Sequence, residues 1–268
     1  MIVKTHSNGA SSSIGKISIK QHSYSSLAGK VDWAEHFLAY CRDHQAPLDF
    51  FSWHVYARTP EPIAAKCVRM RKLLDDNGFK ETESILNEWN YVKGWTDDWV
   101  YSRRVESTEL NLKSAAFTAA TMTLCQSAPL DMLMYYDARP RGMDGLFDAV
   151  TLWPMKGYYP FYAWSKMAKL GRQVRVSASN ANALFATAAR GADGRIGILL
   201  CRYTYDNNVV AAEDYVIRRA DGKPFGEAIG HLTDFARTYT EIPVERAKDG
   251  ALRIQLYPDS FVFIEIEK

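Results

Sequence analysis

Apolar residues along this chain follow two different spacings, and the change falls near residue 171. In the first part, segments with apolar positions three or four residues apart alternate with short continuous apolar runs. Because a helix follows each predicted strand, this part is expected to form parallel βα units with right-handed crossovers. Helices are expected at residues 31–44, 60–78, 115–126 and 159–170, and strands at 48–56, 83–89 and 131–137.

The second part consists of short strands with a period of two, separated by turn signals. This pattern predicts a compact antiparallel β domain over residues 172–268. Residues 1–24 are rich in Ser, Gly, Lys and His and are expected to be poorly ordered, with one strand-like piece at Ile17–Ile19. The β domain's strands are expected at 183–188, 196–203, 215–218 and 261–266, with Asp-Gly turns at 193–194, 221–222 and 249–250.

Composition narrows the class of protein. Of the 268 residues, 47% are hydrophobic and 24% are charged, which is typical of a soluble globular protein. A net charge of +2 with scattered Lys and Arg gives no indication of a nucleic-acid partner. No apolar run is long enough to cross a membrane, and the start of the chain lacks the apolar core of a signal peptide. A cytoplasmic location is therefore expected.

The four cysteines, Cys41, Cys67, Cys125 and Cys201, do not have the spacing of a metal or redox site. We expect buried free thiols. No combination of His, Cys and Asp indicates a metal site elsewhere, and no cofactor is expected.

Polar and aromatic side chains close each of the three predicted strands. Since the carboxyl ends of parallel strands meet at one edge of a sheet, these groups are expected to converge. A carboxylate among an imidazole, amides and rings suits glycoside hydrolysis, in which the carboxylate attacks or stabilises an oxocarbenium-like centre. The end groups are Trp53-His54-Val55-Tyr56, Asn87-Glu88-Trp89-Asn90 and Tyr135-Tyr136-Asp137.

Simpler interpretations of the same residues stay open. Glu88 also fits the start of a polar loop after an edge strand, and His54 fits a hydrogen-bonded core histidine. Tyr135 and Tyr136 fit core or rim aromatics, and Asp137 fits a cap of the following loop.

Two of the strand ends resemble a known family. Leu48–Tyr56 followed by Ile85–Asn90 is similar to the second half of a clan A glycoside hydrolase, most of all the β-xylosidase/α-L-iduronidase family (glycoside hydrolase family 39). Members carry a similar PLDF-S-H-Y strand sixth in the barrel and a similar ILTEWN strand seventh. The resemblance implies that Glu88 is the nucleophile of a retaining mechanism and that His54 and Tyr56 line the sugar subsite.

The resemblance covers roughly residues 25–170, and a C-terminal β domain agrees with it. It implies an α/β fold: a partial (half) TIM-type (β/α) barrel over residues 25–171, followed by a small antiparallel β-sandwich. The expected substrates are β-xylosides or related glycosides. The residues predicted to bind the carbohydrate are Trp53, His54, Tyr56, Asn87, Trp89, Tyr136, Asp137 and Trp153.

The chain also departs from the family. The family's acid/base lies in an Asn-Glu pair that ends the fourth strand, whereas the only Asn-Glu pair here is Asn87-Glu88. The acid/base half of the barrel is therefore expected to be absent, with Asp137 the least implausible substitute, and the isolated chain to be inactive or weak. A half barrel leaves sheet edges open, which predicts a homo-oligomer or a fragment of a longer product.

Two other functions fit the sequence. One is a non-catalytic carbohydrate-binding protein with an aromatic pocket of Trp53, Trp89, Trp95 and Trp153. The other is an inactive fragment without a ligand.

Overall fold

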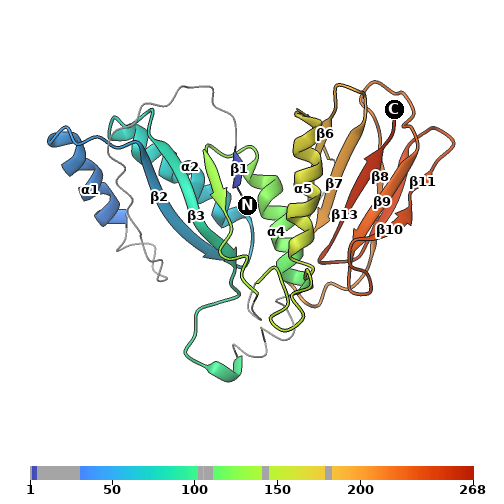
Figure 1. Ribbon diagram of the computed structural model, residues 1–268, viewed down its shortest axis with the longest axis horizontal. Coiled ribbons are helices and arrows are strands. Elements are labelled where there is room, and N and C mark those ends of the chain that lie inside the picture. The colour runs from blue at the N-terminus through green and yellow to red at the C-terminus, as the bar shows by residue number, and fades with distance from the viewer. Residues whose placement is uncertain (1, 5–30, 102–104, 106–110, 141–144, 179–182) are drawn as a thin grey trace. The chain divides into compact units, whose positions relative to one another are not determined.

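The computed structural model describes residues 2–4, 31–101, 105, 111–140, 145–178 and 183–268 (Figure 1). Contacts between Cα atoms divide the chain into two units. The first unit comprises Met1–Asp97 and Leu124–Asp137, and the second comprises Asp98–Thr123 and Ala138–Lys268. Among the described residues, no helix is long and apolar enough to cross a membrane.

The first unit is built on a four-stranded sheet with the order β1-β4-β3-β2. Strands β2, β3 and β4 are parallel, as the alternation of strands and helices predicted, whereas β1 pairs antiparallel with β4. The sequence did not predict β1, and the strand-like piece Ile17–Ile19 lies outside the described residues. The elements of this unit are α1 (Val31–Asp43), α2 (Glu61–Asp76), β1 (Ile2–Lys4), β2 (Phe50–Ala57), β3 (Glu83–Tyr91) and β4 (Met132–Met134).

Helix α2 shows why this part of the chain folds as the pattern predicted. Proline residues occupy its N-cap and first turn, where a missing N–H costs nothing. Beyond its last turn, Gly78 has a φ of +89°, a conformation that glycine adopts without strain. Between these ends, one face is buried at helical spacing, through Ile63, Cys67, Met70 and Leu74.

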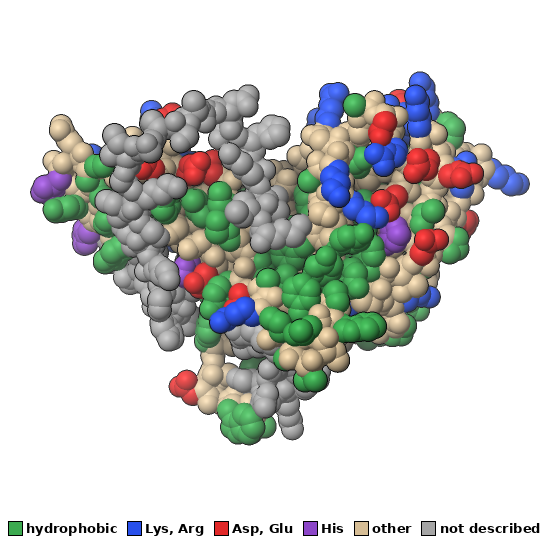
Figure 2. All heavy atoms as spheres, in the orientation of Figure 1, with side chains coloured by type: hydrophobic (Ala, Val, Ile, Leu, Met, Phe, Trp, Pro, Cys, Tyr) green, Lys and Arg blue, Asp and Glu red, His purple; other side chains and the backbone are tan. Residues whose placement is uncertain are grey.

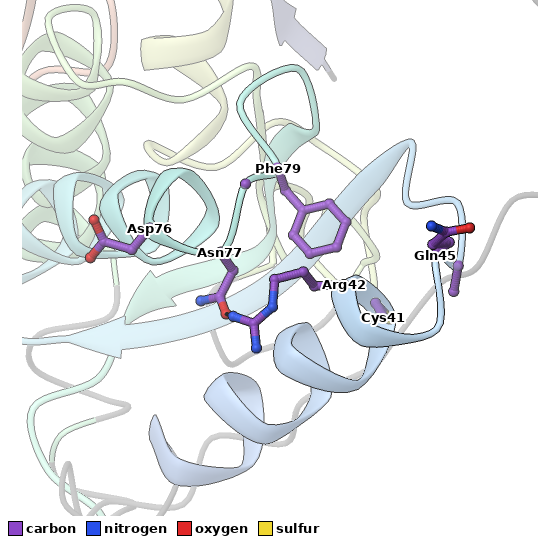
Figure 3. A pocket seen from close by; sticks show the side chains of 8 residues that line it. Cys41, Arg42, Gln45, Asp76, Asn77 and Phe79 are labelled. Atoms are coloured by element: carbon purple, nitrogen blue, oxygen red, sulfur yellow. Dashed lines mark hydrogen bonds between the residues drawn. The ribbon is translucent and has the colours of Figure 1, made fainter.

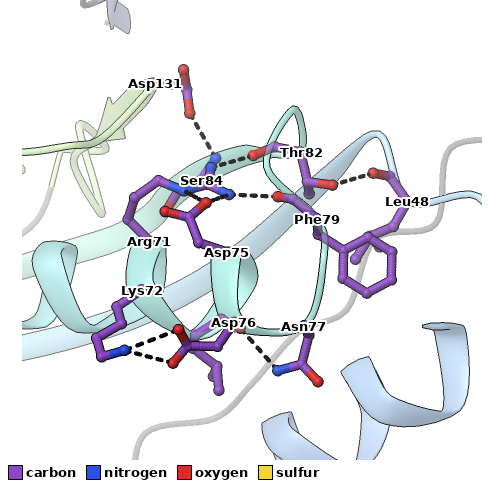
Figure 4. Close-up of polar contacts among 11 residues, drawn as sticks. Leu48, Arg71, Lys72, Asp75, Asp76, Asn77, Phe79, Thr82, Ser84 and Asp131 are labelled. Carbon is purple, nitrogen blue, oxygen red and sulfur yellow. Dashed lines mark hydrogen bonds and ion pairs between the residues drawn. The ribbon is translucent and has the colours of Figure 1, made fainter.

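A polar network at the amino-terminal edge of the sheet fixes where β3 begins (Figure 4). Arg71 donates to the carbonyl oxygens of Thr82 (2.6 Å) and Phe79 (2.5 Å), and the Thr82 hydroxyl donates to the carbonyl of Leu48 (2.7 Å). The Ser84 amide donates to the Asp131 carboxylate (2.8 Å), which ties β3 to the start of β4. These bonds fix the register of the strands, and therefore which residues lie at their opposite, carboxyl-terminal ends.

The second unit contains a six-stranded sheet, β10-β9-β13-β7-β6-β5, and a three-stranded sheet, β11-β12-β8, both antiparallel. Helix α4 (Leu112–Cys125) begins in this unit and ends in the first. The other elements are α5 (Tyr158–Leu170), β5 (Arg172–Val174), β6 (Leu184–Arg190), β7 (Ile196–Arg202), β8 (Glu213–Ile217), β9 (Ala228–Thr233), β10 (Thr240–Pro243), β11 (Glu245–Arg246), β12 (Leu252–Leu256) and β13 (Ser260–Ile266).

The two sheets share one apolar core, to which Leu200, Leu252, Val262 and Ile264 contribute. The opposite face of the six-stranded sheet is covered by helices: the Cys201 thiol lies 3.1 Å from the carbonyl oxygen of Ala116 in α4, and α5 packs on β6 and β7. Both faces of β7 and β13 are therefore buried, which explains their nearly continuous apolar sequences.

Contacts group most of α4, and all of α5, with the second unit, although the sequence assigned both helices to the barrel-like part. The domain boundary near residue 171 stays a prediction. The three Asp-Gly pairs have glycine φ values of +95°, +70° and +78°, in agreement with the predicted turns. All four cysteines are buried and free, as expected.

Aromatic side chains of α5 pack against the loop before β10. The rings of Tyr159 and Tyr239 stack with centroids 5.0 Å apart, and Tyr239 stacks on His231 at 4.8 Å. Figure 2 shows hydrophobic side chains gathered on one face of this unit, over the lower part of α5.

Candidate functional site

A bulge between β2 and β3 places the predicted catalytic carboxylate. Trp53 lies opposite Leu86, but the next residue, His54, lies opposite Glu88, so β3 contains one extra residue, Asn87, in this interval. Such bulges change the direction of side chains next to functional sites. Here the shift brings Glu88 level with His54 near the carboxyl ends of the two parallel strands.

Two side chains of β2 contact the same oxygen of Glu88. The Tyr56 hydroxyl donates to Oε2 at 2.8 Å, and His54 Nδ1 lies 3.1 Å from that atom. Among the described residues, none hydrogen-bonds the other oxygen, Oε1. The Glu88 side chain is 25% exposed, whereas that of His54 is buried at 2%. The carboxylate is therefore held through one oxygen and presents the other.

The hydroxyl of Tyr56 stays protonated in this environment. Burial raises its pKa well above its usual range, and the hydrogen bond and charge of Glu88, together with the charge of Asp137, raise it further. Tyr56 is thus a donor to Glu88 at every physiological pH.

Behind these residues, buried groups hold β2 in place. Lys66 of α2 donates to the carbonyl oxygen of His54 at 2.8 Å and lies 5.6 Å from the centre of the Trp53 ring. The Trp53 indole donates to the Ser84 hydroxyl at 3.1 Å. Trp53 and Trp89 are fully buried, so in this structure they pack in the core and present no face to a ligand.

The loop after β4 is joined to the end of β3. Asn90 donates to the carbonyl oxygen of Tyr136 at 2.6 Å, and the Tyr136 amide donates to the carbonyl oxygen of Trp89 at 3.2 Å. Tyr136 is 38% exposed at this edge. The side-chain oxygens of Asn87 and Asn90 are buried, and no described residue hydrogen-bonds them. They are acceptors that a bound hydroxyl group could satisfy.

The structure thus brings together Glu88, His54 and Tyr56 by direct contact, with Tyr136 and Asp137 on the adjoining loop. Trp153 belongs to the second unit, where it is exposed, and its part in the site stays a prediction. Trp95, predicted only for the aromatic pocket, packs its ring edge-on against Tyr56 at 5.7 Å and is half exposed. Lys66 was not predicted, because a helix lysine carries no sequence signal for a contact with a strand carbonyl. Asn90 belongs to a strand end that the sequence predicted to converge, although it was not among the residues predicted to bind the carbohydrate.

A cavity of ≈ 460 Å³ lies beside the amino-terminal ends of the first unit's strands, between the end of α1 and the end of α2 (Figure 3). Arg42, Asn77 and Phe79 line it, and Arg42 donates to the Asn77 side chain at 3.2 Å. It faces the amino-terminal ends of the strands and so is distinct from the Glu88 site. The described residues contain no group of three or more His, Cys, Asp or Glu side chains that could hold a metal.

Comparisons with known proteins give a fold but no family. No family model matches the sequence, and no curated protein matches it. Among solved structures, the chain is similar to a glucosidase from Croceicoccus marinus, with 20% identity and a TM-score of 0.69 over 87% of this chain and 56% of that one. It is also similar to a family 51 α-L-arabinofuranosidase from Bifidobacterium longum (14%, TM-score 0.57, 93% and 58%). A third similar structure is a family 30 endoxylanase from Clostridium papyrosolvens (14%, TM-score 0.53, 82% and 49%).

The chain therefore has a glycoside hydrolase-like fold of mixed α/β class, with one mainly parallel sheet and two antiparallel sheets. It spans about half the length of the structures that it matches. Similarity at this level of identity concerns the fold alone, and membership of family 39 stays a prediction.

Proposed function

We propose that this chain carries the nucleophile of a retaining glycoside hydrolase site, with Glu88 in that role. One observation supports this most directly: Glu88 is held through Oε2 by Tyr56 and His54, while no described residue bonds Oε1. The residue lies at the carboxyl end of a parallel strand, where α/β barrels carry their chemistry. The glycoside hydrolase-like fold agrees with a carbohydrate substrate.

The geometry suits nucleophilic attack. In a retaining mechanism the carboxylate oxygen forms a bond to the anomeric carbon while the bond from that carbon to the leaving oxygen breaks. Water then cleaves the glycosyl ester and restores the carboxylate. In this site Oε1 attacks, and Tyr56 and His54 keep the carboxylate oriented through Oε2.

The mechanism also requires a second carboxyl group, which protonates the leaving oxygen and lies about 5–5.5 Å from the nucleophile. Asp137 is the described residue that we propose for this role, because it follows Tyr136, whose backbone is hydrogen-bonded to Asn90 and Trp89 at the end of β3. The alternative is a carboxyl group outside the described residues. Hydrolysis of unactivated glycosides depends on this second group, whereas the attack by Glu88 on an activated glycoside does not.

The resemblance to the β-xylosidase/α-L-iduronidase family implies β-xylosides or related glycosides as substrates. The similar structures include an endoxylanase, a glucosidase and an arabinofuranosidase, so the sugar is best tested across these three kinds. We further propose that the parallel sheet is part of a (β/α) barrel. Strands β1 and β2 are the edge strands of the described sheet. Because open edges favour association, we also propose the homo-oligomer that the sequence predicts, which light scattering over a dilution series tests.

Mechanism-based labelling tests the nucleophile without needing an acid. In a 2,4-dinitrophenyl 2-deoxy-2-fluoro-β-xyloside, dinitrophenolate leaves without protonation, and the fluorine slows hydrolysis of the glycosyl ester. We expect the protein to gain the mass of one fluoroxylosyl group, on the peptide that contains Glu88. The corresponding glucoside and arabinofuranoside are run in parallel.

Two variants sharpen the test. Glu88→Gln is expected to abolish labelling, whereas Glu83→Gln, an exposed glutamate at the other end of the same strand, is expected to be labelled like the parent. A label on another residue, or no label from any of the three sugars, would refute the proposed role of Glu88.

A second candidate function is non-catalytic carbohydrate binding, which the half-exposed Trp95 beside Tyr56 favours. Exposed indole rings at a polar site stack on the apolar faces of sugars. Calorimetric binding of xylo-oligosaccharides by a protein that none of the three reagents labels would select this function.

A further inference from the structure

Three loops of the second unit lie at one end of its six-stranded sheet. In the register, Ser260 lies opposite Arg202 and Phe261 lies opposite Thr233. The segments that follow β7 (203–212) and β9 (234–239), and the one that precedes β13 (257–259), therefore emerge at the same end. Each carries an exposed aromatic residue: Tyr205 (58% exposed), Phe235 (67%) and Tyr257 (40%).

Two of these rings contact each other. The centroids of Phe235 and Tyr257 are 5.3 Å apart, and the planes are nearly perpendicular, at 89°. This edge-to-face pair joins two loops while much of both rings faces solvent. We call these two residues the Phe235–Tyr257 pair.

Buried charged residues fix the backbone beneath the pair. Arg202, 4% exposed, donates to the carbonyl oxygens of Ala211 (2.5 Å) and Leu256 (3.1 Å). Lys113, 5% exposed, donates to the carbonyl oxygen of Thr204 (2.6 Å) and pairs with Asp259 (2.8 Å). Both cations thus hold loop carbonyls in fixed positions.

The loop that carries Phe235 is braced separately. The buried carboxylate of Asp234 accepts from the amides of Ala236 (2.8 Å) and Arg237 (2.7 Å) and from the Arg237 side chain (2.7 Å). Lys156 donates to the carbonyl oxygen of Asp234. Because these loops are already held in place, the two rings lose little conformational freedom when a ligand binds, which favours binding.

We propose that the Phe235–Tyr257 pair is a carbohydrate-binding surface of the second unit, which takes one or two pyranose rings of a polysaccharide. Carbohydrate as the ligand class rests on the proposed function. The loops at this end of the sheet also carry both acceptors and donors, Asp206, Asn208 and Arg237, as a neutral polyhydroxyl ligand requires.

The size of the surface favours a sugar over a protein. Two aromatic side chains of about 150–250 Å² each, roughly half exposed, present on the order of 200 Å². A stable protein interface buries about 800 Å² per partner. A surface of this extent matches the faces of one or two sugar rings.

Affinity electrophoresis tests the proposal, with the full chain carrying Glu88→Gln so that no polysaccharide is hydrolysed. The probes are soluble β-1,4-xylan, a mixed-linkage β-glucan and an arabinan. We expect at least one polysaccharide to retard the protein. The double variant Phe235→Ala/Tyr257→Ala is then expected to lose about tenfold in affinity, as for removal of a central aromatic contact.

Two kinds of control separate recognition from misfolding. Phe235→Tyr/Tyr257→Phe keeps both rings and is expected to be retarded within about twofold of the parent. Tyr40→Ala removes a similarly exposed ring (59%) from α1 of the first unit and is expected to leave retardation unchanged. Thermal unfolding confirms that each variant is folded.

The proposal is overturned if the double-alanine variant is retarded as strongly as the parent, if Tyr40→Ala loses as much affinity as the double variant, or if no probe retards the parent. It is also overturned if light scattering gives the double-alanine variant a lower molecular mass than the parent, because the pair would then form a protein interface. Labelling at Glu88 is measured independently on the double-alanine variant without the Glu88 change. Labelling without retardation rejects the binding surface alone, whereas retardation without labelling rejects the proposed nucleophile alone.

Discussion

Glu88 in the first unit and Glu265 in the second are bound in similar ways. In each, the oxygen Oε2 takes two partners, one of them a histidine ring nitrogen: His54 at 3.1 Å for Glu88 and His231 at 2.8 Å for Glu265. The other partner differs. Glu88 accepts from the neutral hydroxyl of Tyr56, whereas Glu265 pairs with the cation Lys166 at 2.7 Å.

The difference has an electrostatic consequence. Burial raises the pKa of the Glu265 carboxyl, but the hydrogen bonds and charges of Lys166 and His231 outweigh it and lower that pKa below its usual range. A full cation at contact distance stabilises a carboxylate and so opposes its use as a nucleophile. A phenol orients the carboxylate without neutralising its charge. The proposed nucleophile, Glu88, is thus bound by a phenol where Glu265 is bound by a lysine.

The largest expected effect comes from substituting the two glutamates themselves. Glu88→Gln should lower the rate of labelling by the fluoroxyloside by more than about a thousandfold, because the attacking atom is lost. Glu265→Gln should leave that rate within about twofold, because its interactions stabilise the second unit only. Intact-mass spectrometry over time measures both rates. Comparable losses in the two variants would show that Glu88 has no special role.

The second prediction concerns the donors. Tyr56→Phe removes the hydroxyl from Glu88 Oε2 and should slow labelling by about tenfold to a hundredfold, because the carboxylate is less well oriented. The chain offers a matched control in Tyr215, whose hydroxyl donates to Glu213 at the same distance, 2.8 Å. Tyr215→Phe should label at the parent's rate. A Tyr56→Phe variant as fast as Tyr215→Phe would assign the Tyr56 hydrogen bond a purely structural role.

The same residues show how much of the site the sequence predicted. Glu88, His54 and Tyr56 were predicted because polar residues that end apolar strands meet at one edge of a parallel sheet. The bulge at Asn87 was not, because the register depends on hydrogen bonds between two strands and leaves no pattern in either one. The burial of Trp53 and Trp89 was also missed, since a parallel strand covered on both faces gives its aromatic residues no preferred side.

Within the fold, the elements that the sequence located correctly carry their own signals. Helix α2 has prolines at its start, a glycine after its end and a single apolar face. Strand β1, in contrast, is only three residues long and is defined by its pairing with β4, far along the chain. The middle of α4 is buried on all sides, from Ala115 to Met122, so its pattern does not tell which sheet it covers. The local sequence therefore predicts where helices and strands lie better than it predicts which other elements they pair with or cover.

The smallest expected effect is a pH dependence that Glu265 should have. Its pKa is lowered in the folded state, so its interactions stabilise the protein above the usual glutamate pKa of about 4.3. This contribution is lost as the pH falls through the lower, folded-state value. Because the side chain is 39% exposed, solvent screening keeps the contribution below about 1 kcal/mol, or roughly 2–4 °C in Tm for a chain of this size.

The measurement is thermal unfolding of the parent and of Glu265→Gln between pH 7 and pH 3. We expect the variant to unfold at a lower temperature at pH 7 and the gap to narrow as the pH falls below the usual glutamate pKa, since a growing share of the parent's carboxyl groups is then protonated and neutral like the amide. Glu245→Gln, an exposed glutamate on β11 of the same unit, should give no such difference at any pH. A gap between parent and Glu265→Gln that persists unchanged at pH 3 would mean that the packing of the side chain, and not its charge, joins α5 to the sheet. The difference in reactivity that we propose between Glu88 and Glu265 would then depend on Tyr56 and His54 alone.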